Sequence, residues 1–266
     1  MRLNEHTGMS PPHPRFCQEE DRQAAIVTPG VTLVPYEARH VEQYHEWMSD
    51  PEIQEATASE PLTLDEEYEN QQSWRTSHDK LTFIICQPLS VSSGTKIETV
   101  QAGDVDASER MIGDINFFIY LSDDDDDDDN GDMDGAARIA NEASYVGEVD
   151  VMIASKEHRG KGVGHAAVTT LLTYVHRNRA RILAEHVHGE GKAGKGSAPE
   201  LKGLMAKIKE GNSASIALFR RLGFVQKGEV NYFGEIQMVL RDLEAFVTSS
   251  AEEMAGLEYR EVAYSR

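Results

Sequence analysis

The sequence predicts a mixed α/β fold, and three observations carry that prediction. Runs rich in β-branched and aromatic residues at 81–86, 111–120 and 145–153 are typical of strands. Apolar residues then recur at helical spacing from position 162 onward. Between the third strand and this helix lies a glycine-rich stretch, so a strand leads into a helix across a sharp backbone turn.

The remaining elements follow from the same periodicities and from local stop signals. Asn212 is placed to cap a helix that runs to Leu222, and Gly223 is placed to end it. Further helices are expected at 40–48 and 64–77, and further strands at 31–35, 204–208, 224–230 and 233–240.

The chain of 266 residues is long enough for one substantial core, so we expect one domain with decorations. The predicted domain covers 31–245, between an irregular N-terminal segment at 1–30 and a polar C-terminal tail at 246–266. Stretches rich in Ser, Gly, Lys or Asp predict loops inserted near 88–110, 121–143 and 186–203.

The formal net charge of -20 argues against nonspecific nucleic-acid binding, which depends on clustered Lys and Arg. Much of this charge lies in the run Asp123–Asp129, where like charges repel one another and favour a solvated loop. A calcium site is the alternative. The run lacks the spaced ligands, central Gly and terminal Glu of an EF-hand loop, so we favour the loop.

The cysteines and the hydropathy of the sequence indicate its compartment, and the surroundings of its histidines indicate whether it binds a metal. Two cysteines in different surroundings, Cys17 and Cys86, fit a reduced compartment. No apolar run is long enough to span a bilayer, and the start lacks a signal-peptide pattern, so we expect a cytoplasmic location with the nucleus left open. No metal is expected, because no Cys or acidic pair completes a site around His158, His176, His186 and His188.

The glycine-rich turn predicts an anion site. The start of a helix points unpaired backbone N–H groups at one spot, and the helix dipole favours an anion there. Glycines at 160, 162 and 164 let the backbone approach such a ligand closely. A pyrophosphate is the natural candidate.

Two other phosphate-binding motifs fit less well. The Rossmann fingerprint G-x-G-x-x-G needs a different spacing from that of Gly160-Lys161-Gly162-Val163-Gly164. The stretch 189–195 matches most of a Walker A loop, but Gly196 stands where the hydroxyl residue belongs. What remains is R-x-x-G-x-G, with Arg159, Gly162 and Gly164 directly after an apolar strand.

In this motif the chain resembles the GNAT acetyltransferases, whose acetyl-CoA-binding motif has the same form. The strand at 148–153 precedes it at the family's spacing, and the segment 212–224 resembles the family's later strand-helix motif. The closer resemblance is to the N-acetyltransferase 9 group. It is carried by Leu33-Val34-Pro35-Tyr36, Tyr44-His45-Glu46-Trp47-Met48, the run at 57–64 and Val151-Met152-Ile153-Ala154, and together these cover most of 31–240.

The resemblance implies a GNAT fold: a twisted, mostly antiparallel sheet that splays at its central strand, with helices on both faces. It implies acetyl-CoA as co-substrate and a protein or peptide amine as acceptor, with no nucleic acid or membrane as partner. The expected cofactor-binding residues are Val151, Met152, Ile153, Arg159, Gly160, Lys161, Gly162, Val163, Gly164 and Asn212.

Glu148 is the first candidate for the general base, because an amine must lose a proton before it attacks a thioester. The alternative is a strand-face acid in an ion pair, and Asp150 on the same face is the reserve. Asn212 is either a helix cap alone or also a contact of the cofactor or of a catalytic water. Ser215 is interpreted as structural.

The chain also departs from the family pattern. Many GNAT enzymes carry a Tyr as general acid where this sequence has Phe219, which cannot donate a proton. Residues 9–30 also stand between a Met-Arg-Leu-Asn start and the first strand, where the family runs almost directly on. The first departure keeps open an alternative function, a catalytically weak acetyl-CoA-binding scaffold on a cytoskeletal partner.

Overall fold

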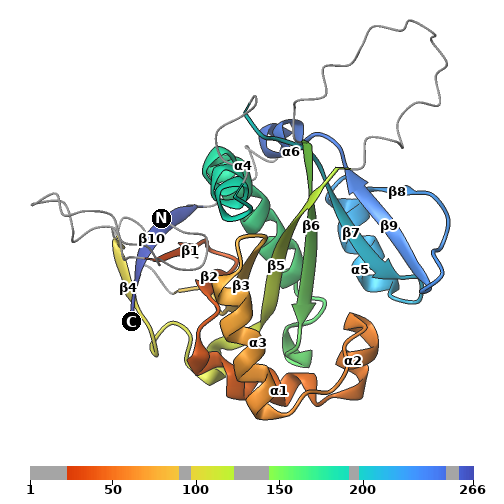
Figure 1. Cartoon of the computed structure of the whole chain (residues 1–266). Helices are drawn as coiled ribbons and strands as arrows, with labels where there is room; N and C mark the ends of the chain where they lie inside the picture. The colour runs from red at the N-terminus through yellow and green to blue at the C-terminus, as the bar shows by residue number, and fades with distance from the viewer. Residues whose placement is uncertain (1–22, 90–96, 123–143, 192–197, 250–257) are drawn as a thin grey trace, which may run out of the picture.

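A computed structural model describes residues 23–89, 97–122, 144–191, 198–249 and 258–266. The described strands form one ten-stranded sheet in the order β4-β10-β1-β2-β3-β5-β6-β7-β9-β8 (Figure 1). The mixed α/β prediction is confirmed. The strands are β1 (Gln23–Val27), β2 (Thr32–Pro35), β3 (Lys80–Cys86), β4 (Thr99–Gln101), β5 (Met111–Leu121), β6 (Ser144–Ile153), β7 (Glu200–Lys209), β8 (Val225–Lys227), β9 (Glu235–Leu240) and β10 (Arg260–Ser265).

Most neighbouring strands are antiparallel, as expected. The two parallel pairs are β6 with β7 and β10 with β4. Strands β5 and β6 form the longest ladder, from Gly113 opposite Ile153 to Leu121 opposite Tyr145. The parallel β6–β7 pair is possible because a long helix crosses between these two strands.

Helices cover both faces of the sheet (Figure 1). One core contains side chains of α4, α5 and α6, and the other contains side chains of α1 and α2. Alternation along β6 serves both cores, because Val149 packs in the first while Met152 packs against the second. The helices are α1 (Val41–Met48), α2 (Pro51–Thr57), α3 (Leu64–Thr76), α4 (Val163–Gly189), α5 (Ser213–Arg221) and α6 (Leu243–Ser249).

Local signals fix the ends of the two helices that follow α1. Asp50 caps α2 by accepting a hydrogen bond from the Glu52 backbone, and Pro51 starts the helix with its preset φ. At the other end Ala58 adopts a left-handed conformation with φ 53°. Thr63 and Glu66 then form a reciprocal capping box at the start of α3.

The expectation of an irregular segment at 1–30 and a polar tail at 246–266 is wrong for the residues described there. Residues 23–27 form β1 and residues 260–265 form β10, and the two strands pair in register from Gln23–Tyr264 to Val27–Arg260. Val262 and Tyr264 alternate into the core, where they are 4% and 2% exposed. A strand this short gives a weak signal by itself, and its partners are distant in sequence.

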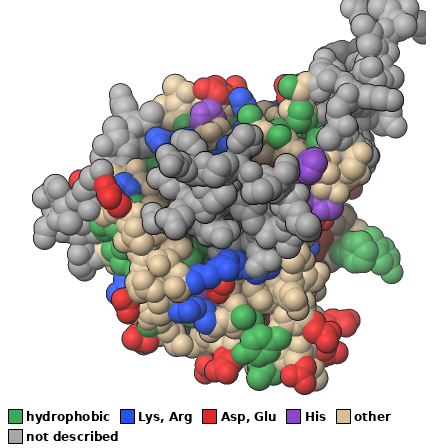
Figure 2. Space-filling model, turned by 60° about the vertical axis from the view of Figure 1, so that its left-hand side comes forward, with side chains coloured by type: hydrophobic (Ala, Val, Ile, Leu, Met, Phe, Trp, Pro, Cys, Tyr) green, Lys and Arg blue, Asp and Glu red, His purple; other side chains and the backbone are tan. Residues whose placement is uncertain are grey.

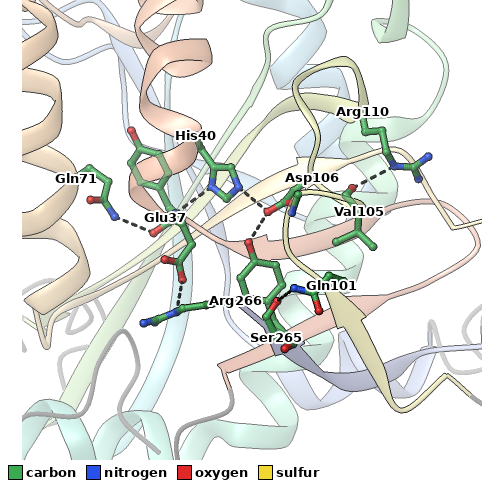
Figure 3. Close-up of polar contacts among 12 residues, drawn as sticks. Glu37, His40, Gln71, Gln101, Val105, Asp106, Arg110, Ser265 and Arg266 are labelled. Atoms are coloured by element: carbon green, nitrogen blue, oxygen red, sulfur yellow. Dashed lines mark hydrogen bonds and ion pairs between the residues drawn. The ribbon is translucent and has the colours of Figure 1, made fainter.

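A buried polar cluster ties β10 to the rest of the domain (Figure 3). The Tyr264 hydroxyl donates to Asp106, whose carboxylate also lies 2.7 Å from His40 Nε2. Arg266 Nε donates to Glu37 Oε1 at 3.1 Å, and Gln101 donates to the Ser265 carbonyl. The C-terminal strand is therefore fixed by one buried cluster around Asp106 and by two exposed hydrogen bonds, one to β4 and one to Glu37.

Three inserted loops were expected. Two of them have different boundaries in the structure, and nearly all of the third lies outside the described residues. Helix α4 continues to Gly189 and β7 begins at Glu200, so the inserted segment is shorter than 186–203. Strand β4 lies within the expected loop at 88–110. The acidic run at 123–129 lies outside the described residues, as does nearly all of the loop expected at 121–143.

The surface charge is dispersed on the face seen in Figure 2. Acidic side chains are scattered, many of them toward its margin, and Lys and Arg form a small group near its centre with others toward its upper and left margins. No helix among the described residues has both the length and the apolar character needed to cross a membrane.

Candidate active site

The sheet splays where the sequence resemblance implies it does. Strand β6 pairs with β7 only as far as Glu148, which lies opposite Met205. Strand β5 stays paired with β6 to Ile153, whereas β7 continues as the partner of β9. In the described part of the chain, residues 149–153 therefore have no strand along their β7 edge. Their backbone groups on that edge are available to a ligand.

Arg159 holds the end of this open strand in place. Its Nε donates to the Ile153 carbonyl at 2.8 Å, and Nη2 donates to the Ala154 carbonyl at 3.3 Å. The rest of its side chain is exposed, and so is Lys161. Arg159 thus connects the open edge of β6 to the turn that follows, which gives this residue a structural role that an isolated motif does not reveal.

The glycines of the turn serve different physical needs. Gly160 and Gly162 have φ of +72° and +84°, and Gly162 is the N-cap of α4. A Cβ at either position would meet nothing within 4 Å, so backbone conformation and not packing requires glycine there. At Gly164 a Cβ would lie 3.2 Å from Leu218 Cδ2 of α5, so this glycine permits close helix packing.

Helix α5 brings three predicted residues to the opening between β6 and β7. Asn212 is the N-cap of α5, because its Oδ1 accepts a hydrogen bond from the Ser215 backbone at 3.1 Å. Both residues also line a cavity beside the splay. Phe219 is 2% exposed, lines the same cavity and meets Phe224 edge to face at 5.0 Å.

This cavity of about 290 Å³ is bounded by three parts of the fold. Strands β5, β6 and β7 supply its floor, α5 and β9 supply one wall, and the opposite wall comes from α1 and the end of α2. Its ionisable lining residues, apart from Tyr44, are Asp114, Glu148, Asp150, Lys207, Lys209 and Glu235. The cavity is acidic on balance, and it lies along the residues that leave the β6–β7 ladder.

Glu148 lies at the point where that ladder ends. It is 7% exposed, and Lys207 Nζ donates to its Oε2 at 2.8 Å. The other pair in the cavity is weaker in geometry, with Lys209 Nζ 3.4 Å from Glu235 Oε1. Of the two roles that the sequence left open, the ion pair is present, and Glu148 also lines the cavity.

Neither aspartate of the cavity contacts a lysine of the described residues. Burial raises the pKa of Asp114 to about 7, against the hydrogen bond from Asn116 and together with the charge of Asp150. Asp150 is open to solvent within the cavity, yet the surrounding protein and then the charge of Glu148 raise its pKa to about 6. Both carboxyl groups thus titrate near neutral pH, as groups at functional sites commonly do.

Replacing Asp114 by Asn should stabilise the protein at pH 8. A folded-state pKa above the unfolded value of about 3.9 means that the folded state binds more protons, so stability is lost as pH rises toward 7. The neutral amide removes that loss. We expect a gain on the order of 2–4 kcal/mol at pH 8, or about 5–10 °C in melting temperature, and little gain at pH 4.

Thermal unfolding at pH 4, 6 and 8 measures this effect. The exposed Asp104 provides a matched control, since Asp104→Asn removes the same charge at a position outside the cavity. A melting temperature for Asp114→Asn that follows the wild type across this pH range would contradict the raised pKa of the buried carboxyl.

The sequence did not identify Asp114 or Lys207 as site residues. A signal for the first was present, because Asp114 and Asn116 are two polar residues on one face of an otherwise apolar strand. Lys207 depends on the parallel register of β6 and β7, which is not readable from the chain. Within the described ranges, no group of three His, Cys, Asp or Glu is arranged to hold a metal ion.

Comparisons with known proteins agree with this geometry. Residues 31–225 match the family model described as Acetyltransferase (GNAT) domain. The chain is 36% identical over 216 residues to an N-acetyltransferase 9-like protein of Caenorhabditis briggsae, covering 81% of this chain and 84% of that protein. It is also 36% identical over 211 residues to Alpha/beta-tubulin-N-acetyltransferase 9 of Homo sapiens, covering 79% of each.

A solved ribosomal L7/L12 alpha-N-protein acetyltransferase has a similar fold, with a TM-score of 0.51 at 14% identity, covering 86% of this chain and 99% of the other. The chain therefore belongs to the GNAT acetyltransferases, and within them to the N-acetyltransferase 9-like group. Its activity class is that of an N-acetyltransferase.

Proposed function

We propose that this protein transfers the acetyl group of acetyl-CoA to a primary amine of a protein or peptide, directly within a ternary complex. The proposal rests on two features that share strand β6. The open edge of β6 leads to the glycine turn before α4, and the acidic cavity lies along the same residues. Donor and acceptor sites would then meet at residues 148–153.

The glycine turn suits the pyrophosphate of acetyl-CoA. Gly160 and Gly162 leave open space where a side chain would otherwise stand, and the first backbone N–H groups of α4 face the turn. Lys161 and Val163 belong to this turn, so we retain all of residues 159–164 as cofactor-binding. The backbone of Val151, Met152 and Ile153 is proposed to pair with the pantetheine arm along the open edge.

The class of acceptor is inferred from the charge of the cavity and from the names of two relatives. Two relatives, from Homo sapiens and Drosophila melanogaster, are named for acetyl transfer to α/β-tubulin. We propose a protein amine of this kind as acceptor for the present chain. An acidic cavity suits an amine, which is a cation in water at neutral pH.

The proposed reaction uses Glu148, the backbone of β6 and Asn212. Glu148 accepts a proton from the amine, and the neutral nitrogen then attacks the acetyl carbonyl. A carbon–nitrogen bond forms, the carbon–sulfur bond breaks and CoA leaves as a thiolate, while the second proton lost by the nitrogen passes to solvent water. Backbone N–H groups of β6 stabilise the oxyanion, and Asn212 at the start of α5 is proposed to contact the cofactor or an ordered water.

Phe219 supplies no proton to the thiolate. Its ring is buried against Phe224, so the position has a packing role. A thiol of ordinary pKa, about 8.5, leaves as the anion without a strong acid. The same observation favours the second candidate function, an acetyl-CoA-binding scaffold with weak turnover, because the usual acid is missing.

Transfer of labelled acetyl groups separates these functions. With purified protein, acetyl-CoA and either tubulin or a panel of peptides with free amines, we expect transfer at least about a hundredfold above the rate without protein. Mass spectrometry would identify the modified amine. Tight acetyl-CoA binding without transfer to any acceptor would favour the scaffold.

A further inference from the structure

The charges around the cavity do not balance. Four carboxyl groups and two lysines line it. Lys207 forms an ion pair with Glu148, and Lys209 lies 3.4 Å from Glu235 and donates to the Phe233 carbonyl. Among the described residues this leaves Asp114 and Asp150 without a cation in contact.

Asp114 is also incompletely hydrogen-bonded. Its side chain is nearly fully buried at 2% exposure, and its Oδ2 accepts a hydrogen bond from Asn116 Nδ2 at 2.7 Å. Its Oδ1 and the Asn116 Oδ1 have no hydrogen-bond partner within the described part of the chain. A buried acceptor without a donor is costly, so oxygens left in this state beside a cavity indicate a missing donor.

Strand register brings these groups together. Asn116 lies directly opposite Asp150 in the β5–β6 ladder, and Asp114 lies opposite Met152. All three polar residues belong to one face of the sheet and line the cavity. Asp150 is exposed in the cavity, whereas Asp114 is buried and accepts a hydrogen bond from Asn116.

We propose that Asp150, Asn116 and Asp114 form the ammonium-binding site for the acceptor amine, with Asp150 as the contact and Asp114 as the buried positioning residue. The ligand class is a primary alkylammonium, which offers three N–H donors and one positive charge to a site that offers oxygens and negative charge. This site rests on the proposed function and specifies how the acceptor is held before Glu148 takes its proton.

The neighbours of this site are compatible with a bound cation. Tyr44 of α1, Glu148 of β6 and Lys207 of β7 line the same cavity, and the charges of Asp114, Glu67 of α3 and Asp150 all act on Tyr44. Lys207 is the one cation among these described neighbours, and it is already 2.8 Å from Glu148. An incoming ammonium therefore gains attraction from two aspartates without displacing a salt bridge.

Ligand-observed NMR titration tests the site without requiring turnover. The probes are n-butylammonium, which resembles a lysine side chain, and alaninamide, which resembles a peptide N-terminus, with n-butanol as the uncharged comparison. At pH 7 we expect wild-type protein to bind at least one ammonium probe and to bind n-butanol far more weakly. Which probe binds indicates whether a lysine or a chain end is the acceptor.

The variants are Asp150→Asn, Asp114→Asn and the exposed control Asp104→Asn. We expect the first two to weaken ammonium binding by about tenfold to a hundredfold, as for loss of a charge-assisted hydrogen bond, and the control to change it by less than about twofold. Equal ammonium affinity in wild type, Asp150→Asn and Asp114→Asn would overturn the proposal.

A measurement on the wild type alone covers the case in which a variant does not fold. Carboxyl resonances of ¹³C-labelled aspartate should show two groups that titrate near neutral pH, and n-butylammonium should lower their apparent pKa values. Resonances unmoved by the probe would also overturn the site. If acetyl transfer fails while ammonium binding follows these expectations, the proposed function is wrong and the binding site stands.

Discussion

Acetyl-CoA affinity should fall by at least about a hundredfold when Gly162 is replaced by Asn and Gly164 by Ala in one variant. Asn tolerates a positive φ better than other side chains, so the turn should keep its backbone path. Its side chain would then occupy the open space above the start of α4. Losing two hydrogen bonds to a charged pyrophosphate at about 1.5–3 kcal/mol each accounts for the size of the effect.

The fold should survive this change. A Cβ at position 164 would be in ordinary contact with Ile153 and tight only against the end of the Leu218 side chain, which can move by a few tenths of an ångström. Gly191, just beyond the other end of α4, has φ of +69° and equally open surroundings. The control Gly191→Asn should therefore cost similar stability without reducing affinity.

Calorimetric titration with acetyl-CoA and thermal unfolding of both variants measure the two effects separately. An unchanged affinity in the folded double variant would remove the glycine turn from the binding site. A loss of affinity in Gly191→Asn equal to that of the double variant would show that the effect comes from general destabilisation of α4.

The sequence predicted the elements whose signals are local. The strand at 145–153, the turn at 159–164 and the helix that follows were placed to within a residue or so at the turn, because periodicity and glycine spacing act over short distances. The cap at Asn212 was predicted for the same reason, since an N-cap involves only residues three positions apart.

Elements that depend on distant pairing were missed or misplaced. Strand β10 has only six residues, and its burial depends on pairing with β1 and β4 far away in the chain. The ion pair between Lys207 and Glu148 spans a parallel ladder whose register is set by tertiary packing.

Helix α2 was missed for a different reason. It is a short segment whose only strong signals are Asp50 and Pro51.

The most informative site residue that was missed, Asp114, breaks a local rule. An aspartate in the apolar strand β5 conflicts with its burial, and such conflicts concentrate at functional sites. The sequence shows an aspartate within an apolar strand but not which residues surround its side chain. Only the ladder shows that Asp114, Asn116 and Asp150 share one face beside the cavity.

Turnover should fall by on the order of 10²–10⁴ when Glu148 is replaced by Gln, because the amide keeps the shape but cannot accept the amine proton. Acetyl-CoA affinity should change little, since the Glu148 side chain lies on the cavity side of β6 and the proposed cofactor contacts there are backbone groups. The loss should shrink as pH rises, because an amine already deprotonated in solution needs less help from a base.

The pair of Glu235 with Lys209 supplies the matched control, because Glu235→Gln removes a Glu–Lys contact from the same cavity but on β9, away from the splay. We expect Glu235→Gln to stay within about threefold of wild-type turnover, while each variant loses about 1 kcal/mol of stability, as for ion pairs in which the lysine is partly exposed. Rates against pH, acetyl-CoA affinity and melting temperature on both variants distinguish the two roles of Glu148. If Glu148→Gln loses several degrees of melting temperature but turns over normally while folded, its pairing with Lys207 is structural, and Asp150 becomes the proton acceptor to test next.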